Sequence, residues 1–393
     1  MNSVLFVDDE PLMRELYTNL SKVLGPDFQI RTVSGGAEAL DVLAKEPVDI
    51  IVSDLAMPQM PGGEFLTTVE RLYPETMRVV ISGVGDELAV ARCLMYGHRY
   101  FQKPLQLKEI ADLVRRISRH GKVLRSERVK KIVGRSDVLP TPPETYLRLT
   151  ELLQDPDSPL DEVARIIESD PGLTARLLQV VNSVAFGYGG KLTTVEEAVQ
   201  IAGVEVVRSL LLALQARHFA EKRLKNKQLL TTFWQHSIET GARCRALARA
   251  ERLSLTEQEI CFTAGLLHDI GKLVLAASEE KIYAELIAAS VRDSVPVFER
   301  ELDVYGATHA DIGAYLLGLW GLPDTIIHPV ERHHNLGTDL GKGFTPVLCV
   351  HLAQNLAPSG KRADKLNEGF LKECGLHDRV PQWEEALRNT QHA

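Results

Sequence analysis

The chain has 393 residues, which is too long for one ordinary hydrophobic core and predicts two or three domains. Its hydrophobic content of 45% is typical of globular proteins, and its formal net charge of −8 argues against a general nucleic-acid coat. No run of eighteen apolar residues occurs and the N-terminus has no basic region, so we expect neither a membrane span nor a signal peptide.

The five cysteines form no CxxC pair; they are Cys93, Cys244, Cys261, Cys349 and Cys374. Cysteines without such spacing are expected to be reduced thiols, which predicts a cytoplasmic protein.

Residues 1 to about 118 alternate short apolar runs with amphipathic segments. The apolar runs are 4–7, 29–33, 50–53, 79–82 and 99–101, and the amphipathic segments lie near 11–24, 36–45, 62–72, 86–96 and 107–118. This α/β alternation predicts a doubly wound, five-stranded parallel sheet with helices on both faces. The functional crevice of such a sheet lies at the carboxyl ends of its strands.

Polar residues stand at the ends of four of these runs, namely Asp8 with Asp9, then Asp54, Ser82 and Lys103. Clustered carboxylates repel one another unless a cation lies among them, and oxygen-only ligands suit Mg²⁺. A Mg²⁺ held by Asp8 or Asp9 and by Asp54 would neutralise an incoming phosphoryl group, which Asp54 could accept as an acyl phosphate. Lys103 would pair with the phosphoryl oxygens, and Ser82 could hydrogen-bond to them. The alternative, a nucleotide-binding sheet with incidental acids, is disfavoured because neither GxxxxGK[ST] nor GxGxxG follows the first run.

Three segments resemble the receiver domain of bacterial two-component response regulators. They are 4–11 (VLFVDDEP), 53–58 (SDLAMP) and 103–104 (KP). The resemblance implies a flavodoxin-like receiver domain over residues 1–118 that takes its phosphoryl group from a sensor histidine kinase.

The same resemblance implies a role for each residue at the strand ends. Asp54 would be the phosphoacceptor, with Asp8 and Asp9 as Mg²⁺ ligands. Ser82 and Lys103 would contact the phosphate. Phe101 would be the switch aromatic, which rotates inward on phosphorylation, and Ser82 would be the second switch residue.

A basic segment follows the predicted receiver. Residues 115–135 contain nine Lys or Arg residues against one acid, Glu127, and show no strand pattern. We interpret residues 119–136 as a solvated linker helix. A dimerising or acid-binding helix is the alternative, and a homodimer therefore stays open.

From residue 137 to about 357 the sequence predicts helices only. Ser158 and Asp170 precede Pro159 and Pro171 as N-caps do, and the pairs Thr194–Glu197 and Thr256–Glu259 fit capping boxes. The remaining residues, 358–393, are polar and mixed, and we expect a C-terminal tail.

The helical region is rich in histidines, with one His-Asp pair. The candidate metal ligands are His236, His268, Asp269, His309, His333 and His334, with His351 as a weaker candidate. Imidazoles with one carboxylate suit Fe, Mn or Zn rather than Ca²⁺. Neighbouring helix residues diverge by about 100°, so His268 and Asp269 can share a metal site only between them or at a helix end. The alternative is that each histidine is an ordinary hydrogen-bonded residue, which is strongest for His351.

The helical region resembles the HDOD (HD-related output domain) family of the HD superfamily. The matching segments are 139–143 (LPTPP), 170–178 (DPGLTARLL), 181–183 (VNS), 265–271 (GLLHDIG), 319–323 (LWGLP) and 333–334 (HH). The resemblance implies a helical bundle over 137–357 that usually serves as a non-enzymatic signalling output.

Comparison with the related HD-GYP phosphodiesterases implies that the six stronger candidates fall on ligand positions and Lys272 on a phosphate-contacting position. This chain departs from those enzymes because it has no Gly-Tyr-Pro loop. The last ligand, normally Asp, is His351, and the acid for a third metal is Thr232. Glu239 replaces an Arg. Losing carboxylate charge disfavours a two-metal hydrolase without excluding metal.

We therefore expect a response regulator in which phosphorylation of Asp54 controls a helical output that binds an unidentified protein partner. The alternative is a phosphorylation-gated, metal-dependent phosphohydrolase that resembles a cyclic di-GMP phosphodiesterase. A DNA-binding regulator is disfavoured, because the basic segment is its only support.

Overall fold

The computed structural model describes residues 2–82, 99–103, parts of 108–118, 126–133, 144–153, 158–182, 192–337, 343–356, 366 and 368–389. The predicted helix near 86–96, Cys93, the segment 139–143, and much of the predicted linker lie outside the described residues. Ser82 and Phe101 are placed by their backbone alone. The chain divides into two compact units, one formed mainly by residues up to 141 and the other by most of the rest.

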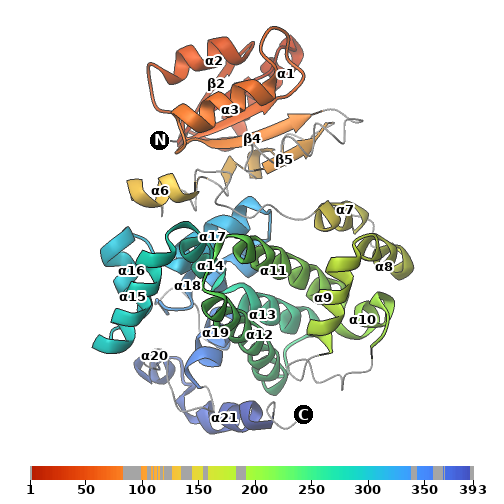
Figure 1. Cartoon of the computed structure of the whole chain (residues 1–393), viewed down its shortest axis with the longest axis vertical. Coiled ribbons are helices and arrows are strands. Elements are labelled where there is room, and N and C mark those ends of the chain that lie inside the picture. Colours follow the sequence, from red (N-terminus) through yellow and green to blue (C-terminus); the bar gives the residue numbers. More distant parts are fainter. Residues whose placement is uncertain are drawn as a thin grey trace. The chain divides into compact units, whose positions relative to one another are not determined.

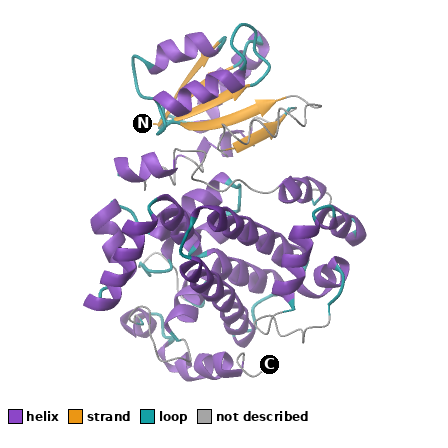
Figure 2. Ribbon diagram, in the orientation of Figure 1, coloured by secondary structure: helices purple, strands orange, loops and turns teal. Residues whose placement is uncertain are grey.

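The first unit contains the predicted five-stranded parallel sheet (Figures 1 and 2). Its strands are β1 (Asn2–Val7), β2 (Phe28–Val33), β3 (Ile50–Asp54), β4 (Met77–Ser82) and β5 (Arg99–Gln102). They lie in the order β2-β1-β3-β4-β5, which is the flavodoxin-like order. The helices after the first three strands are α1 (Pro11–Leu24), α2 (Gly36–Leu43) and α3 (Gly62–Leu72). The predicted fold class is confirmed for this unit.

The order of the strands determines where the crevice with Asp8 and Asp54 lies. β1 lies between β2 and β3, so the strand order reverses there and a crevice opens at the carboxyl ends of β1 and β3. Val7 pairs with Ser53 in the parallel register, which places the next residues of the two strands, Asp8 and Asp54, side by side. All five residues of β3 are buried, as a central strand covered on both faces requires.

The second unit is helical, and its described residues form no strand (Figure 2). Its helices are α7 (Glu144–Leu152), α8 (Leu160–Glu168), α9 (Pro171–Val181), α10 (Val195–Ala202), α11 (Val204–Arg223), α12 (Lys227–Ala250), α13 (Leu255–Leu267), α14 (Ile270–Ser278), α15 (Glu280–Asp293), α16 (Val297–Tyr305), α17 (His309–Leu319), α18 (Asp324–Arg332), α19 (Pro346–Asn355), α20 (Glu368–Glu373) and α21 (Val380–Asn389), with the 3₁₀ turn η2 (His377–Arg379). The predicted all-helical class is confirmed for this unit.

Two of the four predicted helix starts are found. The start predicted at Ser158 is wrong, because Pro159 is the N-cap of α8. The Asp170 carboxylate accepts a hydrogen bond from the Leu173 N–H, and Thr194 forms a capping box with Glu197. The box predicted at Thr256 is wrong, because α13 begins two residues earlier. There Ser254 Oγ accepts from the Glu257 N–H, and the Glu257 carboxylate accepts from the Ser254 N–H at 2.9 Å. The same spacing occurs at both places, and only Ser254 has the extended backbone that an N-cap needs.

Part of the predicted basic linker is also helical. Helix α6 (Glu127–Val133) lies within it, and Val129 and Val133 on this helix are buried. The boundaries at residues 118, 136 and 357 stay predictions.

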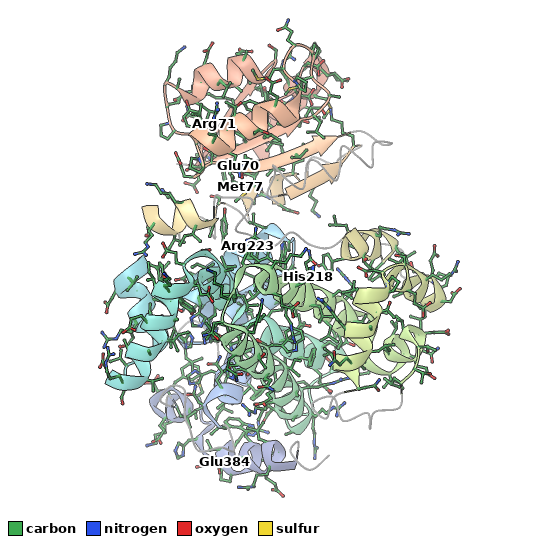
Figure 3. The ribbon with its side chains drawn as sticks, in the orientation of Figure 1. Glu70, Arg71, Met77, His218, Arg223 and Glu384 are labelled. Atoms are coloured by element: carbon green, nitrogen blue, oxygen red, sulfur yellow. The ribbon has the colours of Figure 1, made fainter. Side chains whose placement is uncertain are left out.

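The predicted C-terminal tail contributes to the core of the helical unit. Leu371, Leu376, Trp383 and Leu387 pack with Cys244, Leu348 and neighbouring residues of α12 and α19 in one buried cluster. Trp383 lies on α21 beside Glu384, which Figure 3 labels, and has no exposed surface. Its indole N–H donates to the Glu251 carboxylate at 2.6 Å. The described part of the tail is therefore folded onto α12 and α19.

One helical stretch, Leu255–Ser278, is long and apolar enough by composition to cross a membrane, with a mean hydropathy of 1.5. However, 78% of its apolar window is buried inside the protein. Central core helices pass the same test of composition, so this stretch gives no support for a membrane span.

Candidate functional site

The carboxyl ends of β1 and β3 bring three predicted site residues together. Ligand oxygens of Asp8, Asp9 and Asp54 all lie within 4.8 Å of one another. Lys103, just after β5, places its ammonium 2.6 Å from Asp54 Oδ2 and 3.1 Å from Asp8 Oδ2. Burial lowers the pKa of Lys103, but its hydrogen bonds to Asp54 and Asp8 outweigh this and raise it overall. The ammonium is therefore held charged between two carboxylates.

Backbone and side-chain donors fix the two acids. Asp54 Oδ1 accepts hydrogen bonds from the N–H groups of Leu55 and Ala56 at 2.6 and 3.2 Å, which leaves Oδ2 for Lys103. Gly62 permits this turn, because a Cβ there would lie 2.2 Å from the Asp54 carbonyl oxygen. Asp8 Oδ1 accepts from the Glu10 N–H at 3.0 Å. The oxygen-only donor set fits Mg²⁺, with Asp8, Asp9 and Asp54 as the residues that would hold it.

Sequence analysis missed two supporting residues on α1. The guanidinium of Arg14 donates to the carbonyl oxygens of Asp8 and Asp9 at 2.8 and 2.7 Å. The ring of Tyr17 stacks on Phe6, and its hydroxyl donates to Asp8 Oδ2 at 3.3 Å. Burial and the nearby Asp8 carboxylate raise the pKa of Tyr17. The signal available in the sequence was the three-residue spacing of Arg14 and Tyr17, which puts both residues on one face of α1.

The remaining receiver candidates are placed by strand pairing. Ile81 of β4 pairs with Asp54 and with Phe101, so Ser82 ends its strand one residue beyond the level of Asp54. The side chains of Ser82 and Phe101 lie outside the described residues, so their predicted roles stay predictions.

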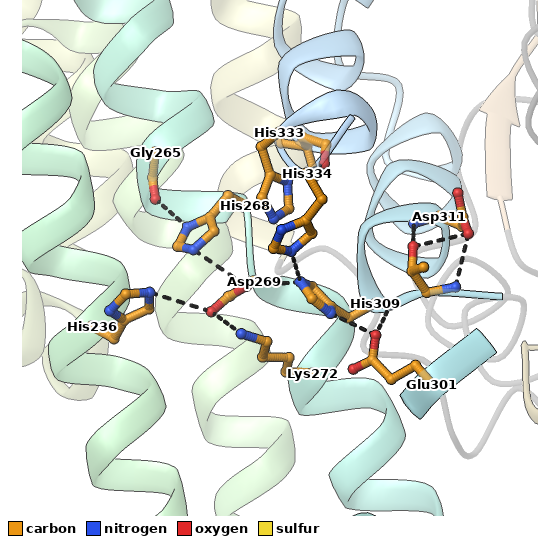
Figure 4. A network of polar contacts seen from close by, with 12 residues as sticks. His236, Gly265, His268, Asp269, Lys272, Glu301, His309, Asp311, His333 and His334 are labelled. Carbon is orange, nitrogen blue, oxygen red and sulfur yellow. Dashed lines mark hydrogen bonds and ion pairs between the residues drawn. The ribbon is translucent and has the colours of Figure 1, made fainter. Parts of the chain in front are cut away.

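The second group of candidates meets where several helices of the helical unit begin or end (Figure 4). His268 is the C-cap of α13 and Asp269 is the N-cap of α14, so this pair lies at the helix end that sequence analysis required. His309 begins α17, and His333 is the C-cap of α18, followed by His334. His236 and Lys272 come from α12 and α14. His268, His309 and His333 have no exposed surface, and Asp269 is 2% exposed.

Asp269 is at the centre of this histidine cluster, which we define as His236, His268, Asp269, Lys272, His309, His333 and His334. One carboxylate oxygen, Oδ1, lies 3.2 Å from His268 Nε2 and 3.1 Å from His309 Nε2. The other, Oδ2, lies 2.7 Å from the Lys272 ammonium and 3.6 Å from His236 Nε2. Both oxygens therefore face nitrogen atoms, on two different sides of the carboxylate (Figure 4).

Backbone carbonyls determine the tautomers of two of these rings. His268 Nδ1 lies 2.7 Å from the Gly265 carbonyl oxygen, and His333 Nδ1 lies 2.6 Å from that of Val330. A carbonyl oxygen only accepts, so each Nδ1 carries a proton, and in a neutral ring the Nε2 then presents a lone pair. His268 Nε2, His333 Nε2 and Asp269 Oδ1 are buried and make no hydrogen bond of good geometry, although Asp269 Oδ1 lies within ion-pair distance of His268 and His309. Buried acceptors that face one another fit a bound metal ion, and the described residues could hold one.

Glu301 on α16 is a functional candidate that sequence analysis missed. Its Oε2 accepts from the His309 backbone N–H at 2.7 Å and lies 2.6 Å from His309 Nδ1, while Tyr283 donates to its Oε1 at 2.6 Å. Burial lowers the pKa of His309, but Glu301 and Asp269 outweigh it and raise the pKa to about 9. Glu299 and Glu301 look alike in the sequence, so only the tertiary structure separates them.

Three other imidazoles of the cluster, those of His236, His333 and His334, favour the neutral form. Burial lowers the pKa of His236 to about 3 and the pKa values of His333 and His334 well below the usual range. Neutral imidazoles are the form that binds metal.

His351, the weaker candidate, contacts the backbone of the cluster. Its Nδ1 lies 2.9 Å from the His333 carbonyl oxygen. Two triads of the cluster have ligand atoms that all lie within 4.8 Å of one another, and His351 belongs to neither of them. Those triads are His309–His333–His334 and His236–His268–Asp269. His351 therefore supports the end of α18 in this arrangement.

A close approach of two helices brings Asp269 to His309. A Cβ on Gly271 would lie 2.0 Å from the His309 carbonyl oxygen and 2.9 Å from the Gly313 nitrogen. Only glycine lets the start of α14 contact the start of α17 in this way, which explains the glycine two residues after Asp269.

The fold and the acid cluster define the first unit as a response-regulator receiver, and the second unit has an HD-type arrangement of histidines. Family models agree: residues 4–115 match the response regulator receiver domain and residues 139–336 match the HDOD domain. The chain is a response regulator that belongs to the HDOD family.

Similar proteins support both halves. An uncharacterized protein of Treponema pallidum is 28% identical over 207 residues, 52% of this chain and 39% of that protein. The response regulator protein VraR of Staphylococcus aureus is 32% identical over 152 residues, 38% of this chain and 70% of VraR. The crystal structure of an HDOD domain protein of unknown function from Geobacter sulfurreducens shares the fold. It has a TM-score of 0.51 and 22% identity over 65% of this chain and 89% of that one. This chain thus spans about two fifths of the length of the Treponema relative.

Proposed function

We propose that a sensor histidine kinase phosphorylates Asp54, and that this controls an HDOD output that acts by binding a protein partner. The observation that supports this most is the Lys103 ammonium, 2.6 Å from Asp54 Oδ2 and 3.1 Å from Asp8 Oδ2. In the transfer, an Asp54 oxygen bonds to phosphorus as the bond to the donor group breaks. Lys103 then pairs with the phosphoryl oxygens. Mg²⁺ at Asp8, Asp9 and Asp54 would supply charge neutralisation.

Phosphorylation changes the charge at the carboxyl ends of β1 and β3. It adds about −1.5 to −2 charge beside Asp8 and competes for the ammonium that now joins Asp8 to Asp54. Such a local change can bias a two-state element, for which Ser82 and Phe101 are the proposed switch residues. The four cysteines among the described residues are free thiols, which supports our placing this protein in the cytoplasm.

The histidine cluster supports a non-hydrolytic output. A phosphodiester would have to reach ligand atoms on His268, His309 and His333, which have no exposed surface. Lys272, which would contact a phosphate, is paired with Asp269 Oδ2 at 2.7 Å. We therefore infer that the helical unit acts through its surface, with the cluster as an internal organising centre.

Phosphorylation is expected to change amide hydrogen exchange in the helical unit. The measurement compares the full chain with and without acetyl phosphate and Mg²⁺, by mass spectrometry of peptides from residues 142–389. Wild type should show altered exchange there, and Asp54→Asn should show none because it lacks the acceptor oxygen. Identical exchange in phosphorylated and unphosphorylated wild type would refute control of the output by Asp54.

The alternative, a phosphohydrolase, has support in the buried unpartnered atoms of His268, Asp269 and His333. We expect no turnover of cyclic di-GMP or bis(p-nitrophenyl) phosphate by metal-loaded protein, whether or not Asp54 is phosphorylated. Product formation followed by chromatography and absorbance checks this. Metal-dependent turnover that disappears in His268→Ala would replace our proposal with the enzyme.

A further inference from the structure

Tyr17 places an uncharged hydrogen-bond donor inside the acid cluster of the receiver. Its hydroxyl donates to Asp8 Oδ2 at 3.3 Å, and the residue is 1% exposed. The Tyr17 ring stacks on Phe6 of β1, with the ring centroids 4.4 Å apart and an angle of 16° between the ring planes. Because Phe6 is itself fully buried in the sheet, this stack fixes the position of the hydroxyl.

Two donors share the Asp8 oxygen that Tyr17 contacts. The Lys103 ammonium lies 3.1 Å from Asp8 Oδ2 and 2.6 Å from Asp54 Oδ2. The other oxygen of this carboxylate, Oδ1, accepts from the Glu10 N–H at 3.0 Å. Asp8 is 1% exposed, so solvent contributes little to its stabilisation. The charge on Oδ2 is therefore stabilised mainly by Lys103 and Tyr17 together.

The backbone beside Asp8 is held by separate hydrogen bonds. The guanidinium of Arg14 donates to the carbonyl oxygens of Asp8 and Asp9 at 2.8 and 2.7 Å. A change confined to the Tyr17 hydroxyl therefore leaves the end of β1 in place and affects only the Asp8 carboxylate.

Phosphorylation of Asp54 removes one of the two donors from Asp8 Oδ2. The Lys103 ammonium then pairs with the phosphoryl oxygens, so it contributes less to Asp8. A buried carboxylate that loses a donor is destabilised unless another donor remains. Among the described contacts of Asp8 Oδ2, the one that remains is the Tyr17 hydroxyl, which carries no charge and so does not compete with Lys103 for the phosphoryl group.

We propose that Tyr17 is a positioning residue for phosphorylation, because its hydroxyl holds the Asp8 carboxylate while Lys103 moves to the phosphoryl group on Asp54. Without this hydroxyl, Asp8 retains Lys103 more strongly and the phosphorylated state is less favourable. The inference rests on the proposed phosphorylation of Asp54 and adds to it a residue of α1 that sets the stability of the phosphorylated state.

The test is the binding of beryllofluoride, which occupies the place of a phosphoryl group on a carboxylate oxygen. The full chain is titrated with beryllofluoride in excess Mg²⁺, and bound fluoride is measured by ¹⁹F NMR. Tyr17→Phe removes the hydroxyl and keeps the ring that stacks on Phe6. It should need about 3–10-fold more beryllofluoride for half-saturation than wild type does, as expected for the loss of one hydrogen bond to a carboxylate.

The amount bound at saturation separates this role from a folding defect. Tyr17→Phe should reach the same bound amount as wild type, because the receiver stays folded and only its affinity changes. A lower bound amount with the wild-type half-saturation concentration would show partial unfolding, and it would overturn the positioning role.

Two further proteins test the donor itself. The amino acid 4-aminophenylalanine at position 17 restores an N–H donor on the same ring, and it should return half-saturation to near the wild-type concentration. Tyr73→Phe removes a hydroxyl from a half-buried tyrosine between α3 and β4, at the opposite edge of the sheet, and should bind as wild type does.

The contrary outcomes are distinct. Equal half-saturation of Tyr17→Phe and wild type, or no recovery with 4-aminophenylalanine, would overturn the role of Tyr17 while leaving phosphorylation of Asp54 in place. Wild type that binds no beryllofluoride would contradict the proposed phosphorylation of Asp54, and the role of Tyr17 would fail with it.

Discussion

Replacing Asp54 with Asn is expected to abolish the incorporation of a phosphoryl group from acetyl phosphate and Mg²⁺. Asn presents an amide where the acyl phosphate must form, although it can still accept the hydrogen bonds from the N–H groups of Leu55 and Ala56. The fold should therefore persist while the phosphoacceptor is lost. The measurement is intact-protein mass spectrometry after incubation, with acetate release as the second product.

The same strand region offers a matched control. Asp49 is exposed and lies just before β3, at the opposite end of the strand from Asp54, and its carboxylate accepts a hydrogen bond from the Ser3 N–H. Asp49→Asn should label as wild type does. Equal labelling of Asp54→Asn and wild type would show that the phosphoryl group goes elsewhere, and it would overturn the receiver assignment.

The receiver site could be predicted because its signals are local. Four of the five apolar runs end at or next to a functional residue, and parallel strands bring their ends to one edge, so Asp8, Asp54 and Lys103 had to lie close together. The hydrogen bonds of Arg14 and Tyr17 depend on how α1 lies over β1, which the sequence pattern does not specify. The sequence therefore indicates the reacting groups better than the side chains that orient them.

The histidine cluster was predictable to a lesser extent. The sequence indicated that His268 and Asp269 must lie at a helix end to act together, and the structure places them at the ends of α13 and α14. It could not show that Glu301 contacts His309 or that Lys272 pairs with Asp269 on one side only. Those contacts depend on the packing of separate helices, for which the sequence has no periodic signal.

The sequence says little about the C-terminal segment, because its apolar residues are few and widely spaced among polar ones. Trp383 and Leu387 are one helical turn apart and form the buried stripe of α21. The structure therefore predicts a large effect for a residue that the sequence placed in a tail. Trp383→Ala should lower the free energy of unfolding of the helical unit by about 3–5 kcal/mol, the usual cost of removing a buried tryptophan side chain. It also leaves the Glu251 carboxylate without the indole donor at 2.6 Å.

Tryptophan fluorescence can report this loss. The chain has three tryptophans, Trp234, Trp320 and Trp383, and residues 1–118 contain none, so two reporters remain in the variant. Urea unfolding should show a lower midpoint for Trp383→Ala. Trp383→Phe, which keeps most of the ring packing and loses the hydrogen bond to Glu251, should have a midpoint between those of Trp383→Ala and wild type.

Glu385→Ala, exposed on the same helix, should unfold at the wild-type midpoint. A wild-type midpoint for Trp383→Ala would mean that α21 does not belong to the core, because no other described contact of that helix could compensate for an empty site of this size.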